Sequence, residues 1–157
     1  MGSLGKFQLV KLREHSLVSS DSLTPDLIRD AMPSKENFMY SIKFFINKLP
    51  KSLNVKLRSH YFELDKENKN WSFLINLAVY GKKPDKPLNK ARIKVIRYCK
   101  KYLDYDGFVG SLKPVIDSLV KAELIIDDNW NVLKDWDLDQ IISKDKLGLE
   151  IELQEIE

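Results

Sequence analysis

The stretch from Asp104 to Asn129, DYDGFVGSLKPVIDSLVKAELIIDDN, encloses one amphipathic segment between two pairs of carboxylates. Apolar side chains recur at helical spacing through its middle, at Leu112, Val115, Ile116, Leu119 and Val120. This spacing predicts a helix with a single apolar stripe. Ser111 is a suitable N-cap for it, and Pro114 would then lie in the first turn, where it removes no intrahelical hydrogen bond.

The carboxylates of Asp104 and Asp106 precede that helix, and those of Asp127 and Asp128 follow it. If both flanking loops attach to the same end of a sheet, three or four carboxylates meet in one small volume. Carboxylates that close do not all stay ionised without a cation, and Mg²⁺ is a divalent ion that takes such oxygen ligands. The alternative interpretation is that these aspartates only cap helices and start turns.

The order of these residues resembles the RusA family of Holliday junction resolvases, particularly its phage-borne members. The matching positions are Asp104, Asp106, Gly110, Lys113, Asp117, Leu119, Asp127 and Asp128. One position departs from the pattern, because the family usually has Asn directly after the second Asp and this chain has Gly107. The resemblance begins near Tyr40, covers most of the chain after it, and is most specific in the central stretch.

This resemblance implies a Mg²⁺-dependent crossover junction endodeoxyribonuclease, with Mn²⁺ as a substitute ion, that hydrolyses phosphodiesters in pairs during DNA recombination and repair. It implies that Asp104, Asp106 and Asp128 are catalytic metal ligands, with Asp127 as a further ligand. The family residue that corresponds to Lys113 is also catalytic, which implies a catalytic role for Lys113. The expected partners are branched DNA and a second copy of the chain, because family members are similarly dimeric.

Two other functions stay open at this point. The first is a non-catalytic DNA-binding relative, which the Gly107 departure suggests. The second is an adaptor protein whose acidic C-terminal part binds a basic partner. Asp117 lies one helical turn after Lys113 and could orient it through an ion pair, although a surface salt bridge at this spacing is nearly as common.

Charge is distributed unevenly along the chain, which has a formal net charge of +3. Residues 104–157 carry five Lys against fourteen Asp or Glu, whereas Lys82 to Lys101 hold nine Lys or Arg against one Asp. A basic surface beside an acidic metal site suits a nuclease, and a solvated charged face is the alternative. We expect Arg58, Lys100 and Lys101 to contact DNA phosphates, where a guanidinium can bind in a bidentate way.

Composition limits the class of protein. A chain of 157 residues with 43% hydrophobic residues suits one globular domain. We expect residues 40–157 to form the RusA-like nuclease domain, and residues 1–39 to be an N-terminal extension of unknown role. No apolar run is long enough for a membrane helix or a signal peptide, which favours a cytoplasmic location. Cys99 is the only cysteine, which excludes an internal disulfide and predicts a small buried side chain.

The remaining chain predicts an α/β fold. Period-two alternation predicts strands near residues 38–49, 91–102, 135–142 and 147–153, with the last two forming a hairpin around Ser143 to Lys146. Residues 54–80 predict one long helix or two. The strand at 91–102 has two mixed faces, which suggests that it faces solvent or lies near an edge. Because it runs into Asp104, we expect Asp104 and Asp106 to project side by side from extended chain.

Together these elements predict a single domain with a mixed sheet of about four or five strands and helices packed mainly on one face.

Overall fold

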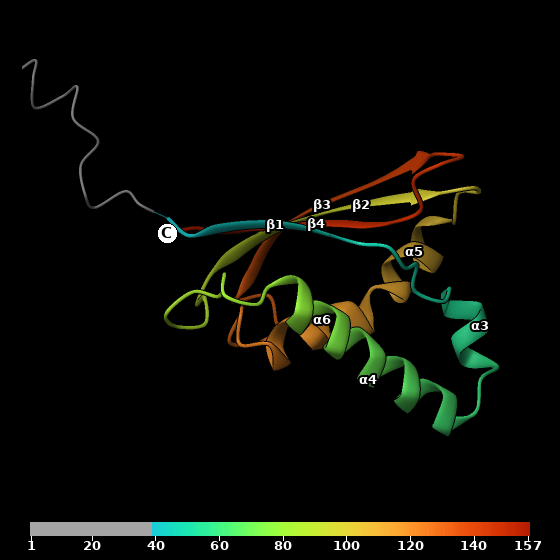
Figure 1. The fold of residues 1–157 in the computed structure, drawn as a ribbon, viewed down its shortest axis with the longest axis horizontal. Coiled ribbons are helices and arrows are strands. Elements are labelled where there is room, and N and C mark those ends of the chain that lie inside the picture. The colour runs from blue at the N-terminus through green and yellow to red at the C-terminus, as the bar shows by residue number, and fades with distance from the viewer. Residues whose placement is uncertain (1–38) are drawn as a thin grey trace, which may run out of the picture. The chain divides into compact units, whose positions relative to one another are not determined.

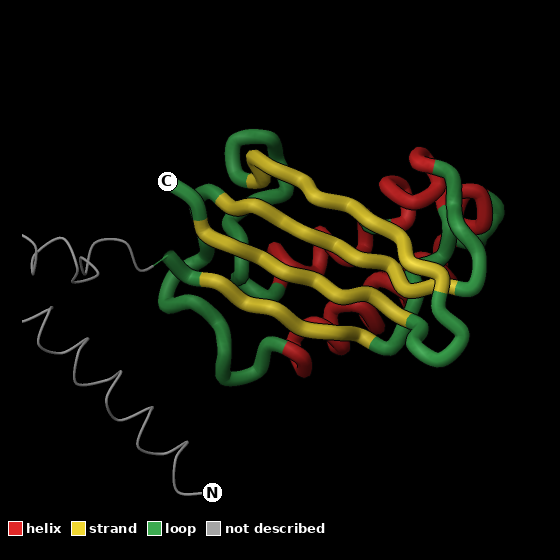
Figure 2. Tube along the Cα trace, turned by 90° about the horizontal axis from the view of Figure 1, so that it is seen from above, coloured by secondary structure: helices red, strands yellow, loops and turns green. Residues whose placement is uncertain are grey.

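Four strands form one mixed sheet in the order β1-β4-β2-β3 (Figure 2). The structure is a computed structural model that describes residues 39–157. The strands are β1 (Ser41–Ile46), β2 (Ala91–Cys99), β3 (Leu133–Ile142) and β4 (Gly148–Glu155). β4 pairs antiparallel with both β1 and β2, and β2 pairs parallel with β3.

Among the described residues, helices cover one face of this sheet and leave the other face open (Figures 1 and 2). They are α3 (Leu53–Leu57), α4 (Tyr61–Ala78), α5 (Tyr105–Ser111) and α6 (Lys113–Lys121). The core lies between the two layers. On the sheet it is built by alternate side chains of each strand, including Ile42, Phe44, Ile93, Val95, Ile151 and Leu153. The predicted single α/β domain with helices on one face is therefore confirmed.

The helix predicted from the apolar stripe is α6. Its stripe residues Val115, Ile116 and Leu119 are buried, and Pro114 lies at its start as predicted. Ser111 is not its N-cap, because a separate helix, α5, ends at that residue and Leu112 takes the capping position. The Ser111 hydroxyl donates instead to the Phe108 carbonyl, 2.6 Å away within α5.

The predicted hairpin between the last two strands is wrong. β2 lies between β3 and β4, and these two strands do not pair with each other. The connection after β3 passes the end of β2, where the Ser143 amide donates to the Cys99 carbonyl at 2.9 Å. Alternation at period two predicts a strand and its buried face, but it does not choose the neighbour.

β2 is central rather than near an edge, with β4 and β3 on its two sides. Its two faces differ because one lies against the helices and the other is exposed to solvent. Solvent exposure was the other cause that the sequence suggested. The segment 54–80 divides into α3 and α4, and the polar run Asp65 to Asn70 lies inside α4. Cys99 is buried and free, as predicted.

The expected extension at residues 1–39 lies almost wholly outside the described residues, which begin at Met39. Between Met39 and Glu157, none of the helices has the length and apolar character needed to cross a membrane.

Candidate functional site

The carboxylates of Asp104 and Asp106 lie at the start of α5. Asp104 is the N-cap residue, and its carbonyl accepts the first helical hydrogen bond from the Phe108 amide at 2.9 Å. Asp106 is exposed in the first turn. The prediction that both project from an extended strand is wrong, because β2 ends at Cys99 and the chain turns into a helix directly after Asp104. Carboxylates in this position face the positive end of the helix dipole.

Gly107 gives the Asp104 side chain its space. A Cβ atom at position 107 would overlap the Oδ1 atom of Asp104, because the carboxylate lies directly against the glycine. The departure from the RusA pattern at this position therefore has a structural correlate. An asparagine here would require the Asp104 carboxylate to turn away from its present position.

Lys113, at the start of α6, joins that helix to the loop that carries Asp128. Its Nζ atom contacts the Asp128 carboxylate and lies 2.9 Å from Oδ1 of Asp117. The hydrogen bond to Asp128, with that to Asp117, raises the pKa of Lys113. In turn, the Lys113 ammonium lowers the pKa of the Asp128 carboxyl. The ion pair between Lys113 and Asp117 within the helix forms as their spacing suggested. The fold also brings the Asp128 carboxylate to the same ammonium.

Asp127 holds the backbone of the loop that carries Asp128. Its carboxylate accepts a hydrogen bond from the Asp128 amide at 2.7 Å and another from Nδ2 of Asn129 at 2.5 Å. An aspartate that bonds the following backbone in this way stabilises a turn. In this geometry Asp127 positions the loop, and its oxygens are already engaged.

The predicted carboxylates do not form one cluster. Within residues 39–157, no three Asp, Glu, His or Cys side chains are grouped as a metal ion would require. The donor type suits Mg²⁺, because every candidate offers hard oxygen ligands. The arrangement has Asp128 joined to an ammonium and Asp104 lying against Gly107.

Two hollows flank the start of α5. One, of about 400 Å³, is lined by Asp128 and Lys134 together with the aromatic side chains of Tyr105 in α5, Trp130 in the loop before β3, and Trp136 in β3. The other, of about 530 Å³, is lined by Asp104, Arg97, Lys100, Lys101 and Tyr102. Tyr105 and Trp130 are 75% and 82% exposed.

Sequence reasoning did not include these aromatic residues in the site. Tyr105 stands between Asp104 and Asp106, and Trp130 follows Asp128 by two positions. Their closeness in sequence to the carboxylates was a signal that could have included them.

The basic residues divide into groups with different environments. Lys100 and Lys101 are exposed beside the hollow that Asp104 lines. The predicted contact of these lysines with DNA phosphates requires such a position. Arg58 is exposed at the end of α3. By contrast, Arg97 is buried and donates to the Lys101 carbonyl at 3.0 Å and to Oε1 of Gln140 at 3.1 Å.

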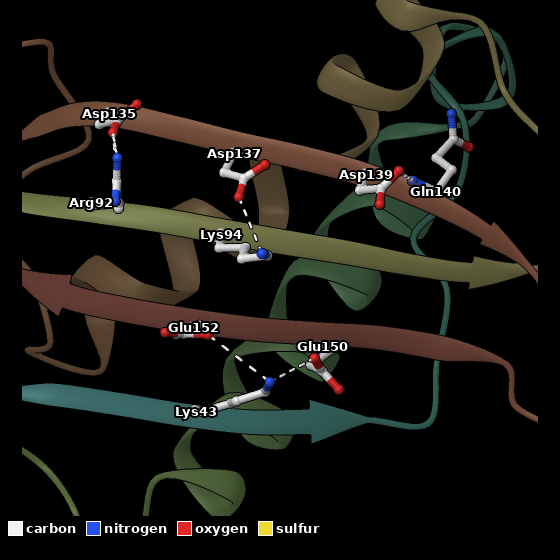
Figure 3. A network of polar contacts seen from close by, with 9 residues as sticks. All are labelled: Lys43, Arg92, Lys94, Asp135, Asp137, Asp139, Gln140, Glu150 and Glu152. Atoms are coloured by element: carbon white, nitrogen blue, oxygen red, sulfur yellow. Dashed lines mark hydrogen bonds and ion pairs between the residues drawn. The ribbon is translucent and has the colours of Figure 1, made fainter.

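Arg92 and Lys94 point to the open side of the sheet, where each is paired with an aspartate of β3 (Figure 3). The basic run from Lys82 to Lys101 is therefore not one phosphate-binding surface, because strand alternation sends its members to opposite faces.

Lys56 of α3 supports α5 from the other end. Its Nζ atom donates to the carbonyls of Gly110 and Ser111, at 3.2 and 2.8 Å, which are among the unpaired carbonyls of the helix C-terminus. Burial lowers the pKa of the Lys56 ammonium. A half-buried cation thus holds α5, and with it the Asp104 loop, against α3.

In comparisons with known proteins, the chain matches no family model and no curated protein.

Proposed function

We propose that this protein is a cytoplasmic, metal-dependent DNA endonuclease of the RusA type. It would resolve four-way junctions by paired phosphodiester hydrolysis during recombination and repair. The observation that carries the proposal is the contact of Lys113 with Asp128 across the loop after α6, together with the hollow that Asp128 lines with Tyr105 of α5. The Lys113 ammonium thus meets two carboxylates from separate segments, Asp117 and Asp128.

Each residue has a chemical task in this proposal. The Lys113 ammonium would neutralise negative charge that builds on the scissile phosphate, and Asp117 would hold it in position from one turn along the helix. Asp104, Asp106 and Asp128 would hold Mg²⁺ or Mn²⁺, with Asp127 beside them, and the ion would supply an activated water and charge relief. Before that, the Lys113 side chain has to leave Asp128.

The substrate follows from the surroundings of these residues. Exposed Lys100 and Lys101 beside Asp104 suit the phosphates of a DNA backbone, as does Arg58. The aromatic rings of Tyr105 and Trp130 suit the faces of unpaired bases, which a branched duplex presents at its crossover. A four-way junction needs two nearly symmetric cuts, which a homodimer with one site in each subunit can make.

A non-catalytic DNA-binding relative is the second candidate, and the position of Asp104 against Gly107 favours it. In that case the carboxylates would shape a DNA-binding loop without assembling around an ion. The adaptor function has weaker support, because Asp135 and Asp137 of the acidic C-terminal part are already paired with basic residues of the same sheet.

A cleavage assay on a synthetic four-way junction tests the proposal, with Mg²⁺, with EDTA and with the Asp106→Asn protein. We expect paired symmetric nicks that require the ion. The Asp106→Asn variant should lose more than about 100-fold in rate, because even a residue that only supports a metal ligand contributes 10–100-fold. Equal nicking by the variant would contradict the proposal.

Junction binding without nicks would favour the non-catalytic relative. In that case the Gly107→Asn variant becomes informative, because it displaces the Asp104 carboxylate and restores the residue typical of the family. Nicking that appears only in this variant would identify Gly107 as the cause of inactivity.

A further inference from the structure

The face of the sheet that none of the helices within residues 39–157 covers has an unusual order of charges. We call it the open face. It consists of alternate side chains of all four strands: Ser41, Lys43 and Phe45; Glu150, Glu152 and Gln154; Arg92, Lys94, Ile96 and Tyr98; Asp135, Asp137, Asp139 and Ile141. Figure 2 shows this face toward the viewer, with the helices behind it.

Charge on the open face changes sign at every strand. Across the sheet, β1 contributes a cation, β4 carboxylates, β2 cations and β3 carboxylates (Figure 3). One register row shows the pattern in full, since Lys43 is opposite Glu152, Glu152 opposite Lys94, and Lys94 opposite Asp137. Neighbouring strands are joined by ion pairs, with Lys43–Glu150 at 2.9 Å, Arg92–Asp135 at 2.5 Å and Lys94–Asp137 at 3.3 Å.

This order has a consequence for docking two copies of the chain face to face. In the order β1, β4, β2, β3 the strands are positive, negative, positive and negative. In the reverse order, β3, β2, β4, β1, they are negative, positive, negative and positive. A twofold axis parallel to the strands, between β4 and β2, reverses the order in the second copy. It brings β1 over β3 and β4 over β2, so that every charged strand meets the opposite charge. A twofold axis across the strands would bring each strand over its own copy and like charges together.

We propose that the open face is the interface of a C2 homodimer whose twofold axis runs along the strands between β4 and β2. In this arrangement Lys94 lies over Glu152 of the second copy, and Lys43 lies over Asp137 of the second copy. Two sheets that pack face to face keep their strands within about 30° and their backbones about 10 Å apart, which suits this alignment. The row of Lys43, Glu152, Lys94 and Asp137 then continues its alternation of charge in the third dimension.

The apolar residues of the open face gather toward one end of this interface. Phe45 and Ile141 are each 38% exposed on the two outer strands, and the Phe45 and Tyr98 rings meet edge to face at 6.2 Å. Tyr98 is in register with Gly148, and the Phe45 ring lies over that glycine. The Lys146 ammonium stacks on both rings, 4.7 Å from the Phe45 centroid and 3.8 Å from the Tyr98 centroid. The second copy therefore meets aromatic rings with a cation at this end of the face.

DNA is a poorer occupant of the open face. Its five carboxylates outnumber the cations on the strands, and those cations already have carboxylate partners. A polyanion would meet mostly repulsion there. A second copy meets complementary charge along the row of Lys43, Glu152, Lys94 and Asp137. The interface also leaves the helix layer, with Lys113 and Asp128, on the outside of each subunit.

This inference deepens the homodimer of the proposed function, but it rests on the sheet and not on the carboxylates of the site. Exposed ion pairs stabilise little by themselves, and burying them costs desolvation that the second set of opposite charges offsets. The dimer should therefore weaken as salt is added, because electrostatic complementarity between charged surfaces is screened.

Sedimentation velocity on the full chain tests the interface, using two charge-exchanged variants. In Lys94→Glu/Asp137→Lys the two exchanged residues can still form an ion pair between β2 and β3. In the dimer, however, position 94 now meets the like charge of Glu152 of the second copy, and position 137 that of Lys43. We expect the dimer dissociation constant to rise at least about tenfold. Adding Lys43→Glu and Glu152→Lys reverses the whole row and restores the alternation, so the fourfold variant should dimerise within about threefold of the original chain.

A monomeric original chain at about 100 μM overturns the interface, since that corresponds to a binding free energy weaker than roughly −5.5 kcal/mol. Equal dimerisation of the original chain and the double variant also overturns it, as does a fourfold variant that stays as weak as the double variant. The circular dichroism spectrum of each variant checks that the fold is intact.

The cleavage assay keeps this result separate from the proposed function. Junction nicking by a monomeric chain would reject the interface alone. A dimer that the double variant weakens, but that never nicks a junction, would support the interface and count against the nuclease.

Discussion

The Lys113 ammonium lies between two carboxylates, and this determines how the site responds to pH. Its hydrogen bond lowers the pKa of Asp128, so that carboxyl is ionised more readily in the folded chain than in the unfolded one. The resulting stabilisation is complete above the unfolded pKa of about 3.9 and is lost as the pH falls through the lower, folded value. At neutral pH it is fully present.

Denaturant unfolding at pH 7 and at pH 3 measures this contribution. We expect Asp128→Asn to lower the free energy of unfolding by about 0.5–1 kcal/mol at pH 7, because the pair is partly exposed, and by less at pH 3. Asp145→Asn, which changes an exposed carboxylate of the β3–β4 connection, is the matched control. An equal effect of Asp128→Asn at both pH values would show that the ion pair does not stabilise the fold.

Single residues of the site were predictable to different degrees. The pairing of Lys113 with Asp117 follows from helical spacing, and the structure confirms it at 2.9 Å. The contact with Asp128 depends on how the chain returns after α6, which local spacing does not contain. The predicted orientation of Asp104 was wrong, because the observed one depends on the missing side chain of Gly107 and on a helix, α5, that was not predicted.

At the scale of elements, α5 is held by packing rather than by its own sequence. It has seven residues, two of them glycines, so its intrinsic helix propensity is low. Gly110 lies so close to α3 that an added Cβ would be 3.0 Å from Leu53. The Lys56 ammonium then satisfies two carbonyls at the end of α5. This explains why a sequence pattern predicted α6 and not α5.

We expect Lys56→Ala to lower the free energy of unfolding by about 1–2 kcal/mol, because two carbonyls at the C-terminus of α5 lose a charged donor. The exposed Lys66 of α4 is the control, and Lys66→Ala should change stability by no more than about 0.5 kcal/mol. Urea unfolding compares the two variants. Similar values for both would mean that water replaces the Lys56 ammonium at no cost and that α5 does not depend on it.

The strands show the same limit of prediction. Alternating side chains correctly gave the buried and exposed faces of β1, β3 and β4, since period two fixes which residues share a face. The pairing of strands was not predictable in this way. The insertion of β2 between β3 and β4 depends on contacts between residues far apart in the chain.

At the scale of the whole molecule, the fold redistributes the charge that the sequence groups together. The basic run from Lys82 to Lys101 enters β2 at one end and leaves it at the other, about 30 Å away for nine extended residues. Between these ends, Arg92 and Lys94 face carboxylates and Arg97 is buried. Only the end with Lys100 and Lys101 adjoins Asp104.

Junction affinity should therefore depend on one end of β2. We expect Lys100→Ala/Lys101→Ala to weaken binding and to reduce the slope of log affinity against log salt by about 1–2, because each lost phosphate contact contributes about 0.9. The matched control, Lys82→Ala/Lys86→Ala, removes the same charge from the loop at the other end of β2 and should leave the slope nearly unchanged. Fluorescence anisotropy at several salt concentrations measures both variants. An equal reduction in slope would mean that DNA spans the length of β2, and no reduction in either would place the DNA elsewhere on the molecule. Because these lysines lie outside the open face, the dimer dissociation constant should not change in either variant.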